Sequence, residues 1–315
     1  MQNINDGRLE SLAEAISLMA RTGTGTDACL RHKCLPLPVH YYSPVPDIAD
    51  LEERNYFRHR SLLPGIHWRG EEQLAFLAQL GQMFGDECDW PTEPTKEPYQ
   101  YYTENESFGY GCAAALHCIT RYFRPRKIIE VGSGFSSLVI SCALAINGRP
   151  ESEHTIIDPY PRLTTNSLPW MAELINQRVE LLDVGFFEQL EKNDILFIDS
   201  GHTVRIGGDV NYLILEILPR LAPGVIVHFH DIPMPYEYAK AYFTNPKFRV
   251  FWTESYLLQA FLCFNSQFEV LLAMAYLMTE RKKEFSSAFK HYSPERHHAI
   301  SGSFWMRRKV ESLDT

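Results

Sequence analysis

The chain has 315 residues, of which 45% are hydrophobic and 22% are charged, which is ordinary for a globular protein in water. This length holds one large domain, or one domain with a substantial extension, and is enough to bury a full core. The formal net charge is −9. The chain therefore has no basic excess to neutralise phosphates, which argues against a general nucleic-acid binder.

The cysteines lack paired metal-type spacing and several lie in apolar stretches, so reduced, packed thiols are expected. They are Cys29, Cys34, Cys88, Cys112, Cys118, Cys142 and Cys263. Residues 1–6 lack the basic start and apolar block of a signal peptide. No run of about 18 uninterrupted apolar residues predicts a membrane span. We therefore expect a cytoplasmic protein.

Residues 1–105 differ in pattern from the rest of the chain. The spacing of apolar residues predicts helices at 9–19 and 71–84, and proline-rich, irregular pieces lie between them. Too little of this region resembles a continuous core. We interpret it as a helical and irregular cap or arm on a main domain of residues 106–315.

From residue 106 onward, short apolar runs alternate with helical segments, which is typical of an α/β fold. Strands are predicted at 127–131, 154–158, 179–182, 195–199, 225–230, 268–273 and 303–308. Helices are predicted at 109–123, 138–146, within 161–176, at 208–220 and at 253–263. Residues 280–298 are charged and irregular and offer no helix for a right-handed crossover, so the last two strands are expected to be an antiparallel pair. The expected fold is a Rossmann-like, mostly parallel sheet with an antiparallel last strand.

The segment Lys127–Ser137 carries the strongest single signal. A buried strand with one acid, Glu130, ends in a turn that contains Gly132 and Gly134, and a helix follows. This order opens a cleft for a nucleotide-like ligand at the carboxyl end of a sheet. The dinucleotide fingerprint has a glycine at the sixth position of the motif, where this chain has Ser137, so the turn favours S-adenosylmethionine over NAD. The alternative is a tight turn without a cofactor.

Three predicted parallel strands end in acids or histidines, and parallel strands place their last residues on one edge of the sheet. Asp158 ends the second strand, at a distance along the chain that suits an acid contacting ribose hydroxyls. The fourth strand ends in Asp199-Ser-Gly-His202, and the fifth ends in His228-Phe-His-Asp231. Polar strand ends of this kind indicate a cleft.

Two carboxylates and an imidazole at these strand ends, those of Asp199, Asp231 and His230, suit a Mg²⁺, Mn²⁺ or similar ion. Such an ion would lower the pKa of an acceptor hydroxyl and direct it at a methyl donor. The alternative is that Asp199 caps the next helix while His230 and Asp231 bond loop amides. His228 shares a face of the strand with His230 and would support the site.

His202 is the candidate general base, because a histidine of near-neutral pKa can accept a hydroxyl proton as alkyl transfer proceeds. Asp199 and His230 would position the hydroxyl, directly or through an ion. The alternative for His202 is a loop histidine bonded to a backbone carbonyl.

Four motifs in order resemble class I S-adenosylmethionine-dependent methyltransferases. They are Glu130-Val-Gly-Ser-Gly-Phe-Ser-Ser, Ile157-Asp-Pro-Tyr-Pro, Asp194-Ile-Leu-Phe-Ile-Asp-Ser-Gly-His-Thr and Leu221-Ala-Pro-Gly-Val-Ile-Val-His-Phe-His-Asp-Ile. The resemblance covers about residues 100–310 and is strongest to the subgroup with Ile-Asp-x-x-His and Phe-His-Asp at the ends of strands four and five. Similar macrocin- and cephalosporin-type O-methyltransferases place a divalent ion on an acid after strand four and an acidic pair after strand five. In this chain His230 replaces the first member of that pair.

The resemblance implies a seven-stranded sheet, methyl transfer from S-adenosylmethionine and a set of cofactor contacts. The cofactor-binding positions that it implies are Glu130, Gly132, Ser133, Gly134, Asp158, Asp183, Val184 and Asp199. Among them Glu130 and the glycine turn would line the methionine side, and Asp158 would hold the ribose. Asp183 with Val184 would flank the adenine.

We interpret the chain as a methyltransferase that uses S-adenosylmethionine to O-methylate a small-molecule or sugar-like acceptor, with or without a divalent ion. The first alternative, a NAD-dependent oxidoreductase or epimerase, is disfavoured by Ser137 and by the antiparallel end strands. The second is a non-catalytic S-adenosylmethionine-binding protein. A nucleic-acid methyltransferase conflicts with the acidic balance, and no membrane partner is expected. The sequence leaves open the acceptor, the need for a metal and the oligomeric state, a homo-oligomer included.

Overall fold

The computed structural model describes residues 6–97, 99–161, 168–246, 249–297 and 301–310. The chain divides into two units. The N-terminal unit comprises Met1–His59 and Ala239–Phe251, and the sheet unit comprises Arg60–Tyr238 and Trp252–Thr315.

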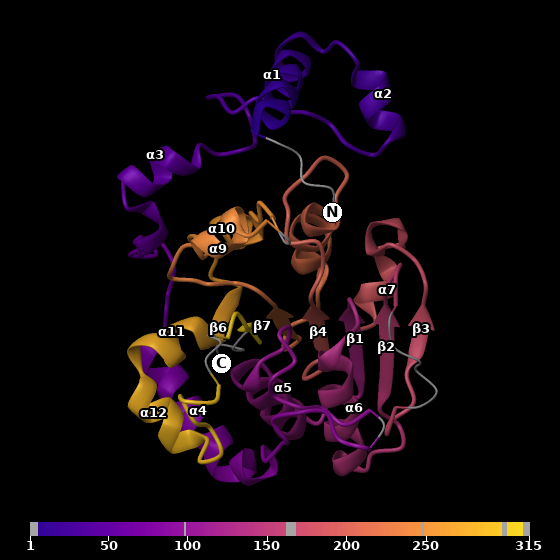
Figure 1. Ribbon diagram of the computed structural model, residues 1–315. Coiled ribbons are helices and arrows are strands. Elements are labelled where there is room, and N and C mark those ends of the chain that lie inside the picture. The colour runs from indigo at the N-terminus through magenta and orange to yellow at the C-terminus, as the bar shows by residue number, and fades with distance from the viewer. Residues whose placement is uncertain (1–5, 98, 162–167, 247–248, 298–300, 311–315) are drawn as a thin grey trace. The chain divides into compact units, whose positions relative to one another are not determined.

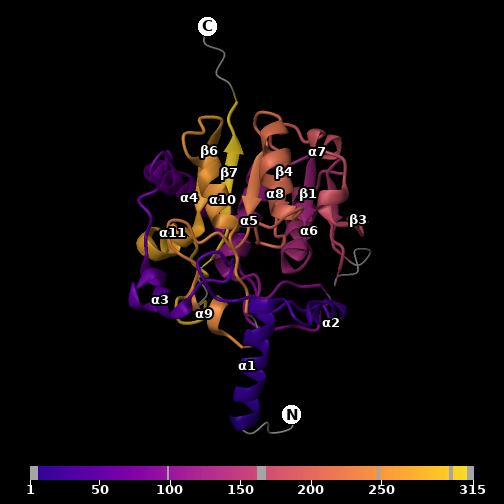
Figure 2. The same cartoon turned by 90° about the horizontal axis from the view of Figure 1, so that it is seen from above.

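A seven-stranded sheet in the order β3-β2-β1-β4-β5-β7-β6 forms the centre of the sheet unit (Figure 1). Its strands are β1 (Lys127–Val131), β2 (Glu153–Ile157), β3 (Glu173–Ile175), β4 (Ile195–Ile198), β5 (Ile226–Phe229), β6 (Phe268–Ala273) and β7 (Phe304–Arg308). Strands β1 to β5 pair in parallel, and β7 is antiparallel to both of its neighbours, β5 and β6. In Figure 2, which views the sheet from above, the labelled strands β6, β7, β4, β1 and β3 follow one another in this order. The predicted mostly parallel sheet with an antiparallel last strand is therefore confirmed.

Burial on both faces explains why the central strands are continuous apolar runs. Every residue of β4, from Ile195 to Ile198, has no exposed surface, and the same holds for β5. A parallel sheet that is covered by helices requires such runs. Single polar residues in these strands, such as His228, are the exceptions, and each needs a partner inside the protein.

The third strand lies elsewhere than predicted. Glu173–Ile175 pairs with β2, whereas Val179–Leu181, inside the predicted strand, forms a 3₁₀ helix. β3 is an edge strand, three residues long and incompletely buried, and so short a half-exposed run leaves only a weak hydrophobic pattern. The helix predicted within 161–176 lies partly outside the described residues, and its last part is the strand β3.

The helices of the sheet unit are α4 (Gly70–Phe84), α5 (Tyr110–Phe123), α6 (Phe135–Asn147), α7 (Gly185–Glu188), α8 (Asp209–Asn211), α10 (Glu254–Leu262), α11 (Met274–Glu280) and α12 (Lys282–Ala288). Among these, α4, α5, α6, α8 and α10 lie where the apolar spacing predicts a helix, whereas α7, α11 and α12 were not predicted. The predicted helix 208–220 is α8 continued by a π-helical turn, Tyr212–Ile217, and a 3₁₀ turn, Leu218–Arg220. α5 packs against both α4 and α6, and all of its residues from Tyr110 to Thr120 are buried.

The connection between β6 and β7 contains α11 and α12, so the expectation of an irregular segment at 280–298 is wrong for residues 282–288. Phe285 and Phe289 are both buried and lie one helical turn apart in this charged stretch. Two aromatic side chains at a spacing of four are enough to give a short helix an apolar face. The antiparallel pairing of β6 and β7 holds despite these helices.

The N-terminal unit contains α1 (Asp6–Thr22), α2 (Thr26–Arg31), α3 (Ile48–Glu53) and α9 (Lys240–Thr244). α1 confirms the helix predicted at 9–19. Inside this unit, Lys240 Nζ lies 2.6 Å from Glu52 Oε1, and the rings of Phe57 and Phe243 lie 5.6 Å apart. α9 therefore packs with the first part of the chain.

The division into units differs from the predicted boundary at residue 105, because residues 60–105 belong to the sheet unit. α4, which the sequence analysis assigned to the cap, packs against α5, α12 and β6. Among the residues that the structure describes, no helix has the length and apolar character needed to cross a bilayer.

Glu87 connects the end of α4 to α5. Its carboxylate lies 2.8 Å from His117 Nε2 and 2.7 Å from Arg121 Nε, both on α5, and Arg121 also bonds Asn147 at the end of α6. The hydrogen bond from His117, opposed by burial and assisted by Arg121, lowers the pKa of Glu87 to about 2.

Replacing Glu87 with Gln is expected to lower the free energy of unfolding at pH 7 by about 1–2 kcal/mol, near the lower end for a hydrogen bond to a charged group because Glu87 is partly exposed. The folded-state pKa is depressed, so this contribution is complete above the ordinary carboxyl pKa of 4.5 and is lost as the pH falls towards 2. Urea unfolding at pH 7, 5 and 3 measures it. The control is Asp86→Asn, since Asp86 is 79% exposed and pairs with Lys290 at the surface. An equal loss in both variants, or a Glu87→Gln loss that does not shrink at pH 3, would contradict the prediction.

Candidate functional site

The site is built on the residues that directly follow four neighbouring parallel strands. The main-chain N–H groups of Asp158, Gly132, Asp199 and His230 each donate to the last carbonyl of the adjacent strand, at 3.1, 2.9, 2.9 and 2.9 Å. The parallel ladder therefore continues one residue past the strands. It sets these four residues in one row along the carboxyl edge of the sheet, where ligands of open α/β sheets bind.

The turn after β1 requires glycine at position 132 for two reasons. Gly132 has φ of 87°, which L side chains rarely adopt. A methyl group there would also stand 2.0 Å from the main-chain oxygen of Asp199. Gly134, in contrast, is extended, and a methyl group on it would meet no atom within 4 Å. The first glycine lets two loops approach each other, and the second faces open space.

Glu130 does not lie on this edge. It is fully buried, and it accepts hydrogen bonds from Ser136 Oγ at 2.6 Å and Ser137 Oγ at 3.0 Å, while His154 Nε2 lies 2.8 Å from its other oxygen. Ser137 Oγ also accepts from Gly134 N at 3.2 Å. The glutamate thus fixes α6 and β2 to the glycine turn, which differs from the expectation that it lines the methionine side.

Asp158 and Ser133 lie against each other beside the glycine turn. Ser133 donates to Asp158 Oδ2 through its main-chain N–H, at 3.0 Å, and through its hydroxyl, at 2.5 Å. Tyr160 N donates to the other oxygen at 2.7 Å. The carboxylate is therefore held in one orientation, with lone pairs left for further donors.

A pocket of about 380 Å³ opens beside this row. Its walls come from the turn after β1, the ends of β2 and β4, and the loop before α5. They are Ser107, Phe108, Ser133, Gly134, Phe135, Ser136, Leu138, Asp158, Tyr160 and Asp199. Asn105 holds the loop by accepting hydrogen bonds from the main chain of Ser107 and Phe108, at 3.0 and 2.6 Å.

Asp183 and Val184 are not among the residues that line this pocket. Asp183 is exposed and accepts a hydrogen bond from Gly185 N at 2.8 Å, at the start of α7. The expectation that these two residues flank an adenine depended on a third strand that ends at residue 182. The strand forms at 173–175 instead, so the expected position next to a strand end is lost.

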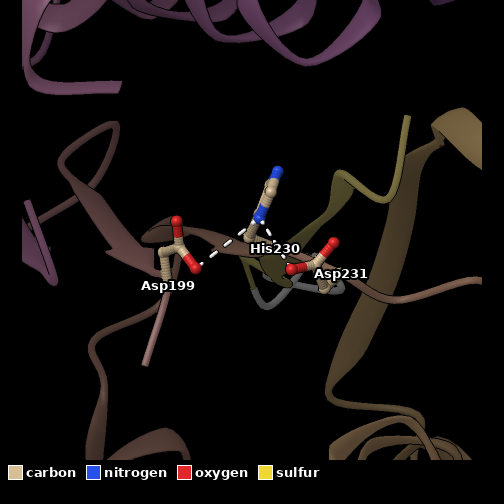
Figure 3. Close-up of side chains that lie close together, drawn as sticks. All are labelled: Asp199, His230 and Asp231. Atoms are coloured by element: carbon tan, nitrogen blue, oxygen red, sulfur yellow. Dashed lines mark ion pairs between the residues drawn. The ribbon is translucent and has the colours of Figure 1, made fainter. Parts of the chain in front are cut away.

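Asp199, His230 and Asp231 form a cluster at the ends of β4 and β5. One ligand atom of each lies within 4.8 Å of the others. Figure 3 shows the His230 ring between the two carboxylates, with Nδ1 3.6 Å from Asp199 Oδ1 and 3.3 Å from Asp231 Oδ2. The residues predicted as metal ligands are therefore together in space.

The charges of this cluster stabilise one another. Burial would lower the pKa of His230, but the carboxylates of Asp231 and Asp199 raise it well above its ordinary value. Burial would raise the pKa of Asp199, but the charge of His230 and the hydrogen bond from His202 hold it well below its ordinary range. The Asp199 carboxylate is consequently ionised at neutral pH and lies beside a protonated His230 ring.

His202 is fixed by the first turn of α10. Its Nδ1 lies 2.8 Å from Glu254 Oε2, and its carbonyl accepts hydrogen bonds from the main chain of Thr253 and Glu254, at 2.9 and 3.1 Å. The Trp252 ring packs at 4.6 Å from the imidazole. The other nitrogen, Nε2, lies 3.1 Å from Asp199 Oδ1. This geometry directs Nε2 at the cluster.

Burial alone would lower the pKa of His202, but the hydrogen bonds with Asp199 and Glu254 outweigh it and raise the pKa to about 10. The imidazole is therefore a cation at neutral pH, whereas a proton acceptor must be neutral. His202 can act as a base only if a bound ligand neutralises part of the charge of the Asp199 and Glu254 carboxylates and thereby lowers the pKa of the imidazole.

Glu254, Cys112 and Phe108 are among the side chains of the site that were not predicted. Glu254 lies 52 residues from His202 in the sequence, and Cys112 lies 118 residues from His230. Phe108 directly precedes the helix predicted at 109–123. His228 lies inside the sheet: it is fully buried, its Nε2 lies 2.9 Å from the Ser303 hydroxyl, and burial keeps its pKa well below the ordinary value.

Comparisons with known proteins agree with this geometry. Residues 129–232 match the family described as "Methyltransferase domain", a range that includes the glycine turn and the ends of β2, β4 and β5. An uncharacterized protein of Archaeoglobus fulgidus is 37% identical over 169 residues, which are 50% of this chain and 75% of the other.

Two solved structures resemble the chain at low identity. One is the O-methyltransferase TomG of Streptomyces achromogenes, involved in tomaymycin synthesis and solved with S-adenosylmethionine; it is 14% identical, with 83% of this chain and 96% of the other covered and a TM-score of 0.39. The other is the methyltransferase PaMTH1 of Podospora anserina, solved with S-adenosylhomocysteine; it is 13% identical, with 88% and 100% covered and a TM-score of 0.39. At these values neither structure bears on the acceptor or on the mechanism.

The domain match covers the part of the chain that carries the site, and the sheet around it has five parallel strands closed by an antiparallel β7. The chain therefore contains a methyltransferase domain at residues 129–232.

Proposed function

We propose that the protein transfers the methyl group of S-adenosylmethionine to a hydroxyl oxygen of a small-molecule acceptor, such as a sugar-like metabolite. One observation carries this proposal: Asp199 lines the pocket beside the glycine turn and also belongs to the cluster with His230 and Asp231. A donor in the pocket and an acceptor at the cluster would therefore be neighbours. The net charge of −9 supports a small acceptor over a nucleic acid.

On the donor side, Gly134 and Ser133 would border the methionine part of the cofactor, and Asp158 would accept hydrogen bonds from the ribose. Both carboxylate oxygens of Asp158 are oriented by internal donors, which supports a fixed contact. Glu130 would act indirectly, because it holds the glycine turn in place from below. Gly132 would act through its close approach to Asp199.

On the acceptor side, His202 would receive the hydroxyl proton at Nε2. The sulfonium methyl is already activated, so the protein needs only to align the oxygen with it and remove one proton. Glu254 supports this role, because a carboxylate on Nδ1 fixes the ring and stabilises the imidazolium that forms. Asp199 and Asp231 would bind near the reacting oxygen.

The cluster also has the donor set of a divalent-cation site. Two carboxylates and one imidazole suit Mn²⁺ and similar ions, their ligand atoms lie within 4.8 Å of one another, and the site faces the pocket through Asp199. Asp199, His230 and Asp231 would hold the ion. A bound ion would make an acceptor hydroxyl more acidic and would neutralise part of the charge that keeps His202 protonated.

The test measures binding and turnover separately. Calorimetry is expected to show binding of S-adenosylmethionine and no binding of NAD. A panel of hydroxylated metabolites is then screened for S-adenosylhomocysteine formation, with EDTA and with added Mg²⁺ or Mn²⁺. No binding of S-adenosylmethionine would overturn the donor site. If EDTA leaves turnover unaffected, the proposal of a bound ion is wrong, whereas the proposal of methyl transfer stands.

His202→Ala is expected to lower kcat by about 10²- to 10⁴-fold, the usual contribution of a positioned base, and to leave the affinity for S-adenosylmethionine unchanged. Glu254→Gln is expected to lower kcat less and to add little in a His202→Ala background, because it acts through the same ring. The control is His67→Ala, since His67 is exposed and lies outside the cluster. Initial rates with an acceptor from the panel decide the matter, and a wild-type rate in His202→Ala would exclude this base.

The two glycines of the turn are expected to respond differently to the same added methyl group. Gly132→Ala should destabilise the fold, because of the contact with Asp199 and the positive φ. Gly134→Ala should keep the melting temperature and weaken binding of S-adenosylmethionine, because its methyl group enters the pocket. Thermal unfolding and calorimetry on both variants distinguish them. Unchanged affinity in Gly134→Ala would mean that the cofactor does not contact this wall.

A further inference from the structure

The two ring nitrogens of His230 face different partners. Nδ1 faces the carboxylates of Asp199 and Asp231, and Figure 3 shows the other nitrogen pointing away from them. That nitrogen, Nε2, lies 3.4 Å from Cys112 Sγ, inside the protein. The imidazole thus bridges the charged cluster and a buried thiol.

Cys112 is itself held firmly. It lies in the first turn of α5, is 3% exposed, and its sulfur lies 2.8 Å from Ser301 Oγ. Ser301 Oγ in turn accepts a hydrogen bond from Ser303 N at 3.2 Å, next to β7. The Phe108 ring packs at 5.2 Å from the imidazole. The thiol and the ring have little room to move apart.

We propose that Cys112 is a positioning residue: its sulfur, held by Ser301, keeps the Nδ1 atom of His230 turned toward Asp199 and Asp231 as the nitrogen donor for a divalent transition-metal ion. This inference rests on the metal-assisted function proposed above. The sequence motifs that indicate methyl transfer do not include Cys112.

The chemistry of imidazole explains why such a partner is needed. When Nδ1 gives its lone pair to an ion, the ring proton is on Nε2, and a group behind the ring must accept it. The Cys112 sulfur, 3.4 Å away, would be this acceptor, and its own hydrogen would then be donated to Ser301 Oγ, 2.8 Å away. A carboxylate ligand has no tautomers, so it would need no such partner. The thiol matters because the residue at position 230 is a histidine.

The presence of a histidine at position 230, where the similar methyltransferases have an acidic residue, also affects which class of ion the site would bind. Carboxylate oxygens suit Mg²⁺ and Mn²⁺, and an imidazole suits transition-metal ions such as Fe²⁺, so a mixed donor set favours a transition-metal ion, Mn²⁺ included, over Mg²⁺. The thiol, by fixing the nitrogen donor, would sustain this preference. We therefore use Mn²⁺ as the probe.

The experiment titrates the full-length protein with Mn²⁺ and follows free Mn²⁺ by electron paramagnetic resonance. Cys112→Ala is expected to weaken Mn²⁺ binding by about 10- to 100-fold, the usual effect of removing the partner of a metal-bound histidine. Cys112→Ser should recover most of the affinity, because the hydroxyl can accept the same hydrogen bond. The control is Cys118→Ala, since Cys118 is equally buried on α5 but contacts Cys88.

Two further measurements separate positioning from general loosening of the core. The nitrogen coupling to bound Mn²⁺, seen by spin-echo modulation, should be present in the wild type and diminished in Cys112→Ala. In a His230→Asp background, Cys112→Ala should leave Mn²⁺ affinity unchanged, because no ring remains to be oriented. If Cys112→Ala does not fold, Ser301→Ala takes its place, with the same expected weakening.

The failures are distinguishable. If the wild type does not bind Mn²⁺ but still binds S-adenosylmethionine, the proposed metal site and the proposed role of Cys112 are both wrong, and the proposal of methyl transfer is unaffected. If the wild type binds Mn²⁺ and Cys112→Ala binds it equally well, the inference about Cys112 alone is overturned. An equal loss in Cys118→Ala would also overturn it, since the effect would then be one of core packing.

Discussion

Four main-chain hydrogen bonds at the carboxyl edge of the sheet determine where chemistry can occur in this protein. Because the ladder runs one residue past β1, β2, β4 and β5, their next residues cannot drift apart: Gly132, Asp158, Asp199 and His230 stand side by side. The side chains that follow each strand are polar, since they leave the apolar interior of the sheet at this point. Donor pocket and charged cluster are therefore two parts of one edge.

The second constraint is that charge cannot be buried alone. Beneath the edge, Glu130 meets His154 and two serine hydroxyls and serves the architecture of the turn. At the edge, the pairing of Glu254 with His202 has the same carboxylate–imidazole chemistry, but the ring's second nitrogen stays directed at the cluster. The buried pair of Glu130 and His154 therefore stabilises the turn, whereas the pair of Glu254 and His202, at the edge, orients a ring toward the cluster.

The sequence predicted the parts of this arrangement that depend on local pattern. Buried parallel strands are apolar runs, so a run that stops at Asp158, Asp199 or His230 reveals both the strand and the edge residue. The short edge strand β3 was misplaced because three half-exposed residues carry too little pattern. The helix at Lys282–Ala288 was missed because its apolar face consists of two aromatic rings in a charged stretch.

The partners of the two site histidines, His202 and His230, could not be predicted in this way. Glu254 and Cys112 reach them through pairings across 52 and 118 residues, which no periodicity encodes. The burial of Glu130 was missed for a related reason. Its position in the strand fixes the face on which it lies, but only the packing of α6 against that face decides whether a ligand or a serine meets it.

The place of Asp199 in both the pocket and the cluster has a thermodynamic consequence. A single carboxylate that contributes to two binding equilibria makes them interdependent, and reciprocity requires each occupant to alter the affinity of the other by the same factor. The sign of this coupling would depend on whether the sulfonium charge of the donor competes with an ion for the shared oxygens or helps to order them. The affinities of the two proposed ligands would thus be linked through one residue of the sheet edge.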